Sequence, residues 1–463
     1  MAQQWLYELM RRHFRPISNL KLRNIPQPAT ISSFLGRTLL AIIITTAIQL
    51  LPIKQGLGAE GPSANNTLST SNAADNLEKK IYQSVKDFEY SDQVASDFVK
   101  MIQPWKCDVL YQKLCQAAED VKQEKISWDQ YAQVEEEAVN QLAQTIKKEI
   151  APADTKVESN WKYFDLAIVV KDKKAHCLGY TQLFYILGNS MGLAIQAVDV
   201  LERSKGQLPD RMGHVACEVG LHNNKTMQVD LTLRDCVSKE FLLADAYANV
   251  GDNWELNDKN NPLNIHPKIK LLDKNGLLAG IYSTRGTVYI KSGKLTEAIS
   301  VCTKAIELNP NSAMAYCNRA NALGNSGKLS DAISDLNKAI DIDPKNAVAY
   351  CSRGTTYRRA GKLNEAISDF SKAIELNPKL FMAYFNRGAA FIRAGQPDKA
   401  LSDCDKAIEL NPNSAEAYGN RGATNAILGN TEDAKNDLRK AMQLNPRLKE
   451  SVQRISDQYE LDL

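Results

Sequence analysis

The chain has 463 residues, of which 44% are hydrophobic and 24% are charged, as in ordinary globular proteins. Its net charge of +3 gives no reason to expect nucleic acid as a partner. The nine cysteines are spread along the chain without CxxC pairs, which argues against a structural zinc site. A chain of this length predicts two or three domains.

The N-terminal part is predicted to engage a membrane. Residues 1–37 form a basic segment, and residues 38–53 (TLLAIIITTAIQLLPI) carry no charge, which predicts a signal-anchor or transmembrane helix. The charge asymmetry then predicts a membrane-anchored or exported protein with the bulk of the chain on the non-cytoplasmic side. A cleaved signal peptide and a buried helix of a soluble domain are the alternatives. The cysteines, which show no pairing pattern, favour a reducing compartment instead.

Residues 54–76 are small, polar and aperiodic, so they are predicted to form a flexible linker. From 77 to 149 the apolar spacing is helical, with interruptions near Pro104 and Ser127. These helices are expected to pack beneath the segment that follows.

Residues 176–192 (HCLGYTQLFYILGNSMG) place Cys177 at the start of an apolar helix that Gly192 ends. A thiol in the first turn faces unpaired N–H groups and the positive end of the helix dipole, which favour the thiolate. His176 adjoins it and could tune it, but adjacent side chains on a helix point apart, which favours the reading in which it has no role. Downstream, two predicted strands carry His214 and Asp230. Cysteine, histidine and aspartate in this order have the chemistry of nucleophile, base and orienting group.

The two strands provide a geometric test, because side chains alternate between the faces of a sheet. A three-residue loop at 222–224, with Asn224 in the left-handed conformation, pairs Ala216 with Asp230 and puts Asp230 diagonal to His214 on one face. A four-residue loop sends them to opposite faces. The sequence permits both loops, and only the first fits a triad.

The same residues carry a family resemblance. HCLGYTQLFYILGNSMGL, followed by GHVACEV and VDLT, resembles the transglutaminase-like core in its bacterial thiol-hydrolase form. The resemblance implies an α+β papain/transglutaminase-like domain within 77–275, with Cys177 as nucleophile, His214 as base and Asp230 as its partner. Two departures are that Val215 and Ala216 replace the aromatic residue that often follows the histidine, and that no oxyanion side chain is assigned; Trp161 is the nearest aromatic candidate.

The last third of the chain repeats every 34 residues. The repeating dipeptides are Asn309-Pro310, Asp343-Pro344, Asn377-Pro378, Asn411-Pro412 and Asn445-Pro446. Together with recurring alanine, glycine and tyrosine positions, this period resembles the tetratricopeptide repeat, whose unit is a pair of helices. It predicts five helix pairs over 279–446, an all-α solenoid, and a capping helix over 447–463.

Stacked repeats bind protein or peptide segments in a concave groove. The usual geometry of the repeat places Lys291, Arg358, Arg359 and Arg393 toward that groove, which favours acidic ligands. Solvated charges on an exposed helix face are the alternative. The lysine and asparagine that clamp a C-terminal carboxylate in this family are replaced by Ser283 and Thr287.

The sequence therefore predicts a cysteine-dependent acyl-transfer enzyme, an amide hydrolase or transglutaminase-like, with a repeat module that binds protein partners or substrate. No cofactor and no metal are implied. The main alternative is a non-catalytic tetratricopeptide scaffold whose transglutaminase-like fold is structural. A non-catalytic module that binds peptidoglycan or protein outside the membrane is a third possibility.

Overall fold

The computed structural model describes residues 70–153, 162, 164–202, 214–233, 236–239, 241, 243–250, 253–257, 266 and 268–462. The chain divides into two compact units, Met1–Gly58 and Ala59–Leu463, and the first lies outside the described residues. The basic segment 1–37 and the apolar segment 38–53 therefore lie outside them too. Among the described helices, none has the combination of length and hydrophobicity that a membrane span requires.

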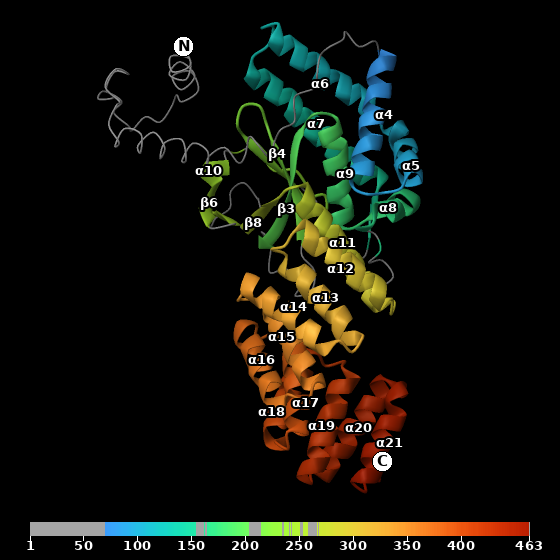
Figure 1. The fold of residues 1–463 in the computed structure, drawn as a ribbon, viewed down its shortest axis with the longest axis vertical. Helices are drawn as coiled ribbons and strands as arrows, with labels where there is room; N and C mark the ends of the chain where they lie inside the picture. The colour runs from blue at the N-terminus through green and yellow to red at the C-terminus, as the bar shows by residue number, and fades with distance from the viewer. Residues whose placement is uncertain are drawn as a thin grey trace, which may run out of the picture. The chain divides into compact units, whose positions relative to one another are not determined.

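Helices form the first layer of the thiol-containing part, which we call the thiol unit (residues 70–272, Figure 1). Ser127 caps the longest of them in a reciprocal capping box with Gln130. The first helix begins at Thr70, inside the range 54–76 that composition predicts as a linker. That prediction is wrong for 70–76, where two alanines and Leu77 favour a helix. These helices are α4 (Thr70–Asp87), α5 (Asp92–Ile102), α6 (Cys107–Lys122), α7 (Trp128–Glu149), α8 (Leu166–Asp172) and α9 (Cys177–Ser190).

A six-stranded antiparallel sheet forms the second layer, with strand order β5-β4-β3-β8-β7-β6. Helix α9 packs on β3 and β4, and Gly188 permits this approach, because a Cβ there would lie 2.0 Å from Ile195. The opposite face has its own small core around Phe241 and Tyr247. The strands are β3 (Ala194–Glu202), β4 (His214–Gly220), β5 (Thr226–Val229), β6 (Tyr247–Val250), β7 (Asn253–Leu256) and β8 (Lys268–Leu272). Two short elements, β1 (Ala151–Pro152) and β2 (Lys174–Ala175), pair in parallel beside α8, and α10 (Leu243–Ala246) precedes β6.

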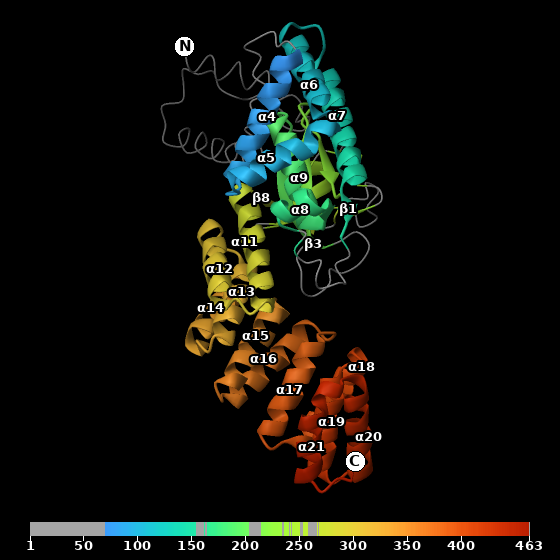
Figure 2. The same cartoon turned by 90° about the vertical axis from the view of Figure 1, so that its right-hand side faces the viewer.

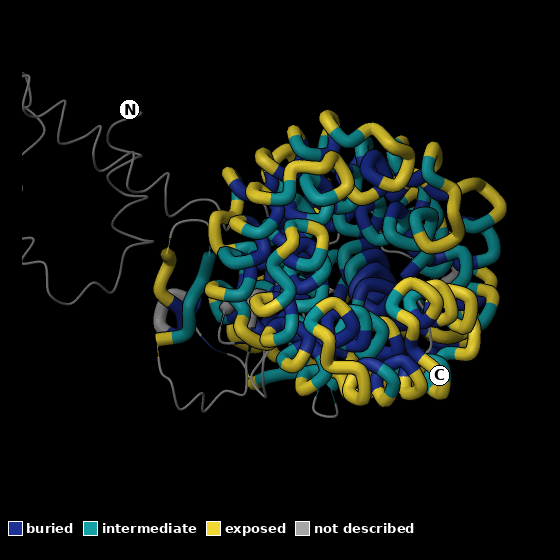
Figure 3. The backbone as a smooth tube through the Cα atoms, turned by 90° about the horizontal axis from the view of Figure 1, so that it is seen from below, coloured by how far each residue is buried: buried dark blue, intermediate teal, exposed yellow. Residues whose placement is uncertain are grey.

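The C-terminal part consists of paired helices, and the prediction of five pairs is confirmed. Within each pair a glycine with positive φ, such as Gly327 at φ 84°, makes the turn, a conformation that favours glycine. Buried residues lie on the inner sides of the helices and exposed ones on the outer turns (Figure 3). The pairs are α11 (Lys274–Lys291) with α12 (Leu295–Leu308), α13 (Ala313–Asn325) with α14 (Leu329–Ile342), α15 (Ala347–Arg359) with α16 (Leu363–Leu376), α17 (Phe381–Arg393) with α18 (Pro397–Leu410), and α19 (Ala415–Leu428) with α20 (Thr431–Leu444). Helix α21 (Lys449–Gln458) packs on the last pair.

Helix α11 belongs to both parts. It contacts β3 and β8 and lies beside β8 in Figure 2. Its Leu277, Leu278 and Ile281 are buried in the main core of the thiol unit. The first repeat is therefore an integral part of the packing of the thiol unit.

Candidate active site

Cys177 is the first residue of α9, and His176 is its N-cap in an extended conformation with φ −108° and ψ −174°. The position gives the sulfur the unpaired N–H groups and the dipole of the helix start. Because His176 lies outside the helix, the rule that adjacent helical side chains diverge does not apply to it, and it forms a side-chain hydrogen bond with Cys177. This contact agrees with the alternative in which His176 could tune the thiol.

His214 and Asp230 are brought together by the β4–β5 hairpin. Asn224 has φ 65°, and Cys217 pairs with Val229, the register that the three-residue loop predicts. Asp230 follows β5 directly, so its carboxylate reaches the ring of His214 at the start of β4. The distance from His214 Nε2 to Asp230 Oδ2 is 2.6 Å, and both side chains are buried. Because Asp230 occupies Nε2, Nδ1 is the ring nitrogen that remains for Cys177.

The electrostatics of Cys177 and His214 favour a negatively charged thiolate beside a positively charged imidazolium. Burial raises the pKa of Cys177, but hydrogen bonds with His176 and His214 outweigh it and lower the pKa to about 5. Burial lowers the pKa of His214, whereas Asp230 and the Cys177 sulfur raise it to about 9. Between these values the thiolate and the imidazolium are the stable forms.

Asp230 stays ionised although it is buried. Burial raises its pKa, but hydrogen bonds from His214 and His266, together with Thr232, lower it far below the usual range. Its Oδ1 accepts from Thr232 N at 3.0 Å and from Thr232 Oγ1 at 2.6 Å. The carboxylate can therefore hold the imidazolium of His214 in one orientation.

A second histidine, His266, contacts Asp230, and no sequence motif indicates it. The distance from His266 Nε2 to Asp230 Oδ2 is 3.2 Å, and the side chain of His266 is buried. A buried polar network places its backbone. His266 N donates to Gln228 Oε1 at 2.7 Å, and Tyr247 Oη donates to His266 O at 2.6 Å. Glu218, on the same strand as His214, accepts from Gln228 Nε2 at 2.9 Å, and burial raises its pKa to about 8.

The groups His214, Asp230 and His266 also have the composition of a metal site, with ligand atoms within 4.8 Å of one another. Ligands of one zinc ion lie about 2.1 Å from the metal and so roughly 3.4 Å from each other. The 2.6 Å between His214 and Asp230 is instead the length of a charge-assisted hydrogen bond. The geometry fits a hydrogen-bonded triad better than a metal centre.

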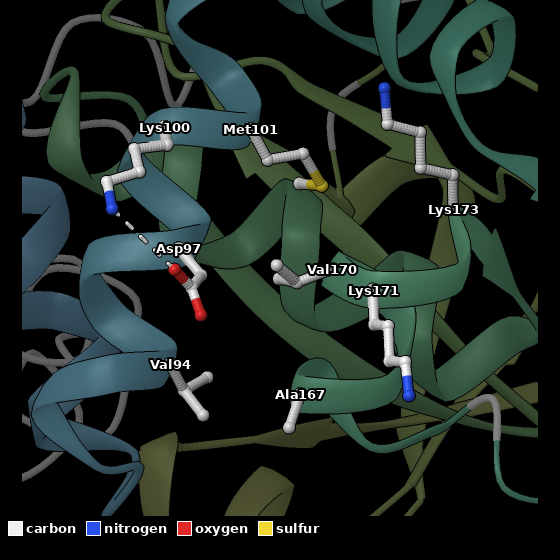
Figure 4. A pocket seen from close by; sticks show the side chains of 8 residues that line it. All are labelled: Val94, Asp97, Lys100, Met101, Ala167, Val170, Lys171 and Lys173. Carbon is white, nitrogen blue, oxygen red and sulfur yellow. Dashed lines mark ion pairs between the residues drawn. The ribbon is translucent and has the colours of Figure 1, made fainter.

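A pocket of about 510 Å³ lies between α5 and α8 (Figure 4), and its lining does not include these three side chains. Apolar side chains such as Val94 and Val170 form its wall, and Lys100 lies 3.9 Å from Asp97 at its rim. Cys177 is not among the residues that line this pocket either. Trp161, the aromatic candidate for the oxyanion site, lies outside the described residues.

The four cations predicted for the groove lie at the last turns of three repeat helices. Lys291 ends α11, Arg358 and Arg359 end α15, and Arg393 ends α17. Within residues 268–462, no carboxylate forms an ion pair with any of these three arginines, and Arg358 Nε is buried without a hydrogen-bond partner. Burial lowers the pKa of Arg358, and the charges of Arg393 and Arg359 lower it further.

Comparison with known families identifies the C-terminal part. Residues 313–346, 347–380 and 381–414 match a tetratricopeptide repeat family, residues 404–436 match another tetratricopeptide repeat family, and residues 286–327 match a TPR repeat family. No curated protein matches the sequence.

Similar solved structures each cover somewhat more than a third of this chain. YrrB, described as a TPR protein with an unusual peptide-binding site, is 27% identical over 36% of this chain and 86% of its own, with a TM-score of 0.30. TTC0263, a thermophilic TPR protein from Thermus thermophilus, is 19% identical over 39% of this chain and 97% of its own, with a TM-score of 0.34. PilF of Pseudomonas aeruginosa is 19% identical over 39% of this chain and 88% of its own, also at 0.34. The family matches show that the C-terminal region, residues 286–446, is an array of tetratricopeptide repeats.

Proposed function

We propose that the thiol unit is a transglutaminase-like acyl-transfer enzyme with Cys177, His214 and Asp230 as its triad. The observation that carries the proposal is the assembled set of groups: a cysteine at a helix start with a pKa lowered to about 5, hydrogen-bonded to a histidine that a buried aspartate holds at 2.6 Å. Perturbed pKa values of this kind cluster at functional sites. The resemblance of HCLGYTQLFYILGNSMGL, GHVACEV and VDLT to that family supports the same assignment.

In the first half of the reaction the Cys177 thiolate attacks the carbonyl carbon of an amide or ester, and a C–S bond forms. The Cys177 N–H at the start of α9 donates to the oxyanion. His214 passes its Nδ1 proton to the leaving nitrogen or oxygen as that bond breaks, and a thioester remains. Neutral His214 then takes a proton from water or an amine, which attacks the thioester and restores the thiolate and imidazolium.

A matched experiment tests the nucleophile without knowledge of the natural substrate. With p-nitrophenyl acetate, the intact protein should release a burst of about one equivalent of p-nitrophenol and carry one acetyl group on Cys177. Cys177→Ala should abolish the burst, whereas Cys217→Ala, which alters a buried thiol on β4, should retain it. Acetylation that persists in Cys177→Ala would overturn the assignment.

A non-catalytic scaffold is the second candidate, because the matched families lie only in the repeats. Such repeats typically mediate interactions between proteins. In that case the intact protein would give no burst, and its Cys177 would alkylate with the pH dependence of an ordinary thiol.

We propose further that the repeats bind an acidic segment of a protein partner through Arg358, Arg359 and Arg393. These guanidinium groups lack a carboxylate in the described array, and the buried Arg358 Nε has a donor to offer. A glutamate-rich peptide should bind, and Arg358→Gln with Arg393→Gln should weaken it by about tenfold or more. Arg439→Gln, on an exposed position of α20, is the matched control and should have no effect. Equal loss in both variants would refute a defined site.

A further inference from the structure

One ion pair recurs through the repeat array. An arginine on the first helix of a repeat binds, through two nitrogens, the aspartate 16 residues later on the second helix, at 2.7–2.8 Å. The same arginine lies over the ring of the tyrosine three residues before it. The four pairs are Arg319–Asp335, Arg353–Asp369, Arg387–Asp403 and Arg421–Asp437.

The first repeat departs from this pattern. Its arginine is Arg285, over Tyr282 as in the other repeats, but Val301 stands where the aspartate belongs. Arg285 Nη2 instead donates to Asp165 Oδ2 at 2.8 Å, in the thiol unit, and Tyr282 donates to Glu89 there. Two recurring side chains of the first repeat thus contact the thiol unit, and Arg285 has no aspartate at the usual position within its own repeat.

Asp165 is joined closely to the backbone that leads to the site. Its other oxygen, Oδ1, caps α8 by accepting from Ala167 N at 3.0 Å. The preceding residue, Phe164, is buried, and its carbonyl accepts from Gln182 Nε2 at 2.6 Å. Gln182 lies on α9, the helix that Cys177 begins.

Phe164 connects this anchor to the thiol. Its ring lies 6.0 Å from the ring of His176, inclined by 30°. His176 in turn forms a side-chain hydrogen bond with Cys177, one of the interactions that favour the thiolate. A continuous set of contacts therefore runs from Arg285 on the first repeat to Cys177.

We infer that Arg285 is a positioning residue for Cys177: it fixes Asp165 and Phe164, and so holds His176 against the thiol. This role rests on the proposed function of the Cys177 site. It makes the first repeat helix part of the apparatus that sets the reactivity of the thiol, and it gives the substitution of Val301 for aspartate a functional reason.

The test is the pH profile of Cys177 alkylation by iodoacetamide in the full chain, followed by mass spectrometry of the peptide that contains Cys177. In Arg285→Gln the midpoint should rise by about one pH unit, because a displaced His176 no longer stabilises the thiolate. At pH 5 the alkylation rate should then fall roughly fivefold. Arg285→Lys, which keeps the charge, should restore most of the rate.

Two further variants separate positioning from general destabilisation. Val301→Asp supplies the missing partner within the repeat while leaving Arg285 and Asp165 in place, and it should shift the midpoint in the same direction. Arg319→Gln breaks the equivalent pair one repeat later and should leave the profile unchanged.

The outcomes are distinct. A low midpoint in the wild type that is unchanged in Arg285→Gln and Val301→Asp would overturn the positioning role alone. An equal shift in Arg319→Gln would show a nonspecific effect and overturn it as well. A wild-type midpoint near the ordinary thiol value of about 8.5 would overturn both this role and the proposed function.

Discussion

At the scale of single residues, the cysteines show that burial alone does not make a reactive thiol. Burial raises the pKa of Cys107, Cys302, Cys317 and Cys404 to about 12. It acts in the same direction on Cys177, where two histidines reverse the result. The pKa of Cys177 therefore differs from those of the other four thiols because hydrogen-bond donors and positive charge are supplied at the start of α9.

The pH dependence of acylation follows from the same two groups. Because the pKa of Cys177 is lowered to about 5 and that of His214 is raised to about 9, the rate should rise through about pH 5 and fall through about pH 9. Asp230→Asn removes the charge that retains the proton on His214, so the upper limb should move toward pH 6.5. The rate should drop by about 10²–10⁴-fold, less than in His214→Ala. Stopped-flow acylation by p-nitrophenyl acetate measures both effects; an upper limb that stays near pH 9 in Asp230→Asn would contradict the assignment of Asp230.

At the scale of secondary-structure elements, the hairpin register decides whether His214 and Asp230 lie on the same face of the sheet. The loop between β4 and β5 has three residues, and Asn224 adopts the left-handed conformation that this loop requires. A shift of one residue would turn Asp230 to the other face of the sheet. The site thus depends on a backbone angle some distance from the chemistry.

Replacement of Asn224 tests this dependence. Asn224→Val should destabilise the protein by about 1–2 kcal/mol, because a β-branched residue resists positive φ. Asn224→Gly, which accepts that conformation freely, should be nearly neutral. Urea unfolding gives both values, and equal stabilities for the two variants would show that the loop does not need this conformation.

The elements that the sequence could predict are those with local signals. The five helix pairs follow from the 34-residue period, and α9, β3, β4 and β5 follow from apolar spacing and a short turn. Strands β6, β7 and β8 are short, and β8 inserts between β3 and β7 through pairing that no local pattern announces. His266 enters the site through that insertion, so it could not be predicted from the sequence. The contact between His176 and Cys177 was not expected because the rule applied to it holds for helical residues, whereas His176 is an N-cap.

At the scale of the whole molecule, α11 unites what the sequence divides into two domains. It has the arginine, tyrosine and glycine positions of a repeat, yet three of its apolar side chains lie in the core of the thiol unit. A boundary drawn from the repeat period alone would separate this helix from the core that buries Leu277, Leu278 and Ile281.

Ile281→Ala should therefore act on the thiol unit, although the residue belongs to a repeat helix. Ile281 is 2% exposed, and its truncation should cost about 2–5 kcal/mol. It should also speed the unfolding-dependent labelling of Cys217, a buried thiol on β4. Leu336→Ala, an equally buried change in the second repeat, should destabilise the array without this effect. Timed labelling in mild denaturant, read by mass spectrometry, distinguishes the two; identical Cys217 labelling in both variants would show that α11 is not part of the thiol core.

Because α11 is anchored in the core of the thiol unit, the repeats near it are held more firmly than the repeats far from it. Beyond it, each repeat is held by contacts with its neighbours and by ion pairs that span only 16 residues, so no long loop must close as each is added. The two ends of the array differ in their packing. The first repeat is packed into the core of the thiol unit, whereas the last repeat is packed against the small helix α21. The core of the thiol unit, which includes part of α11, can act as a folding nucleus. The repeats can then fold onto it one after another, starting with the repeat nearest the thiol unit. The repeats farthest from α11 should then open and re-form more easily than the repeat nearest the thiol.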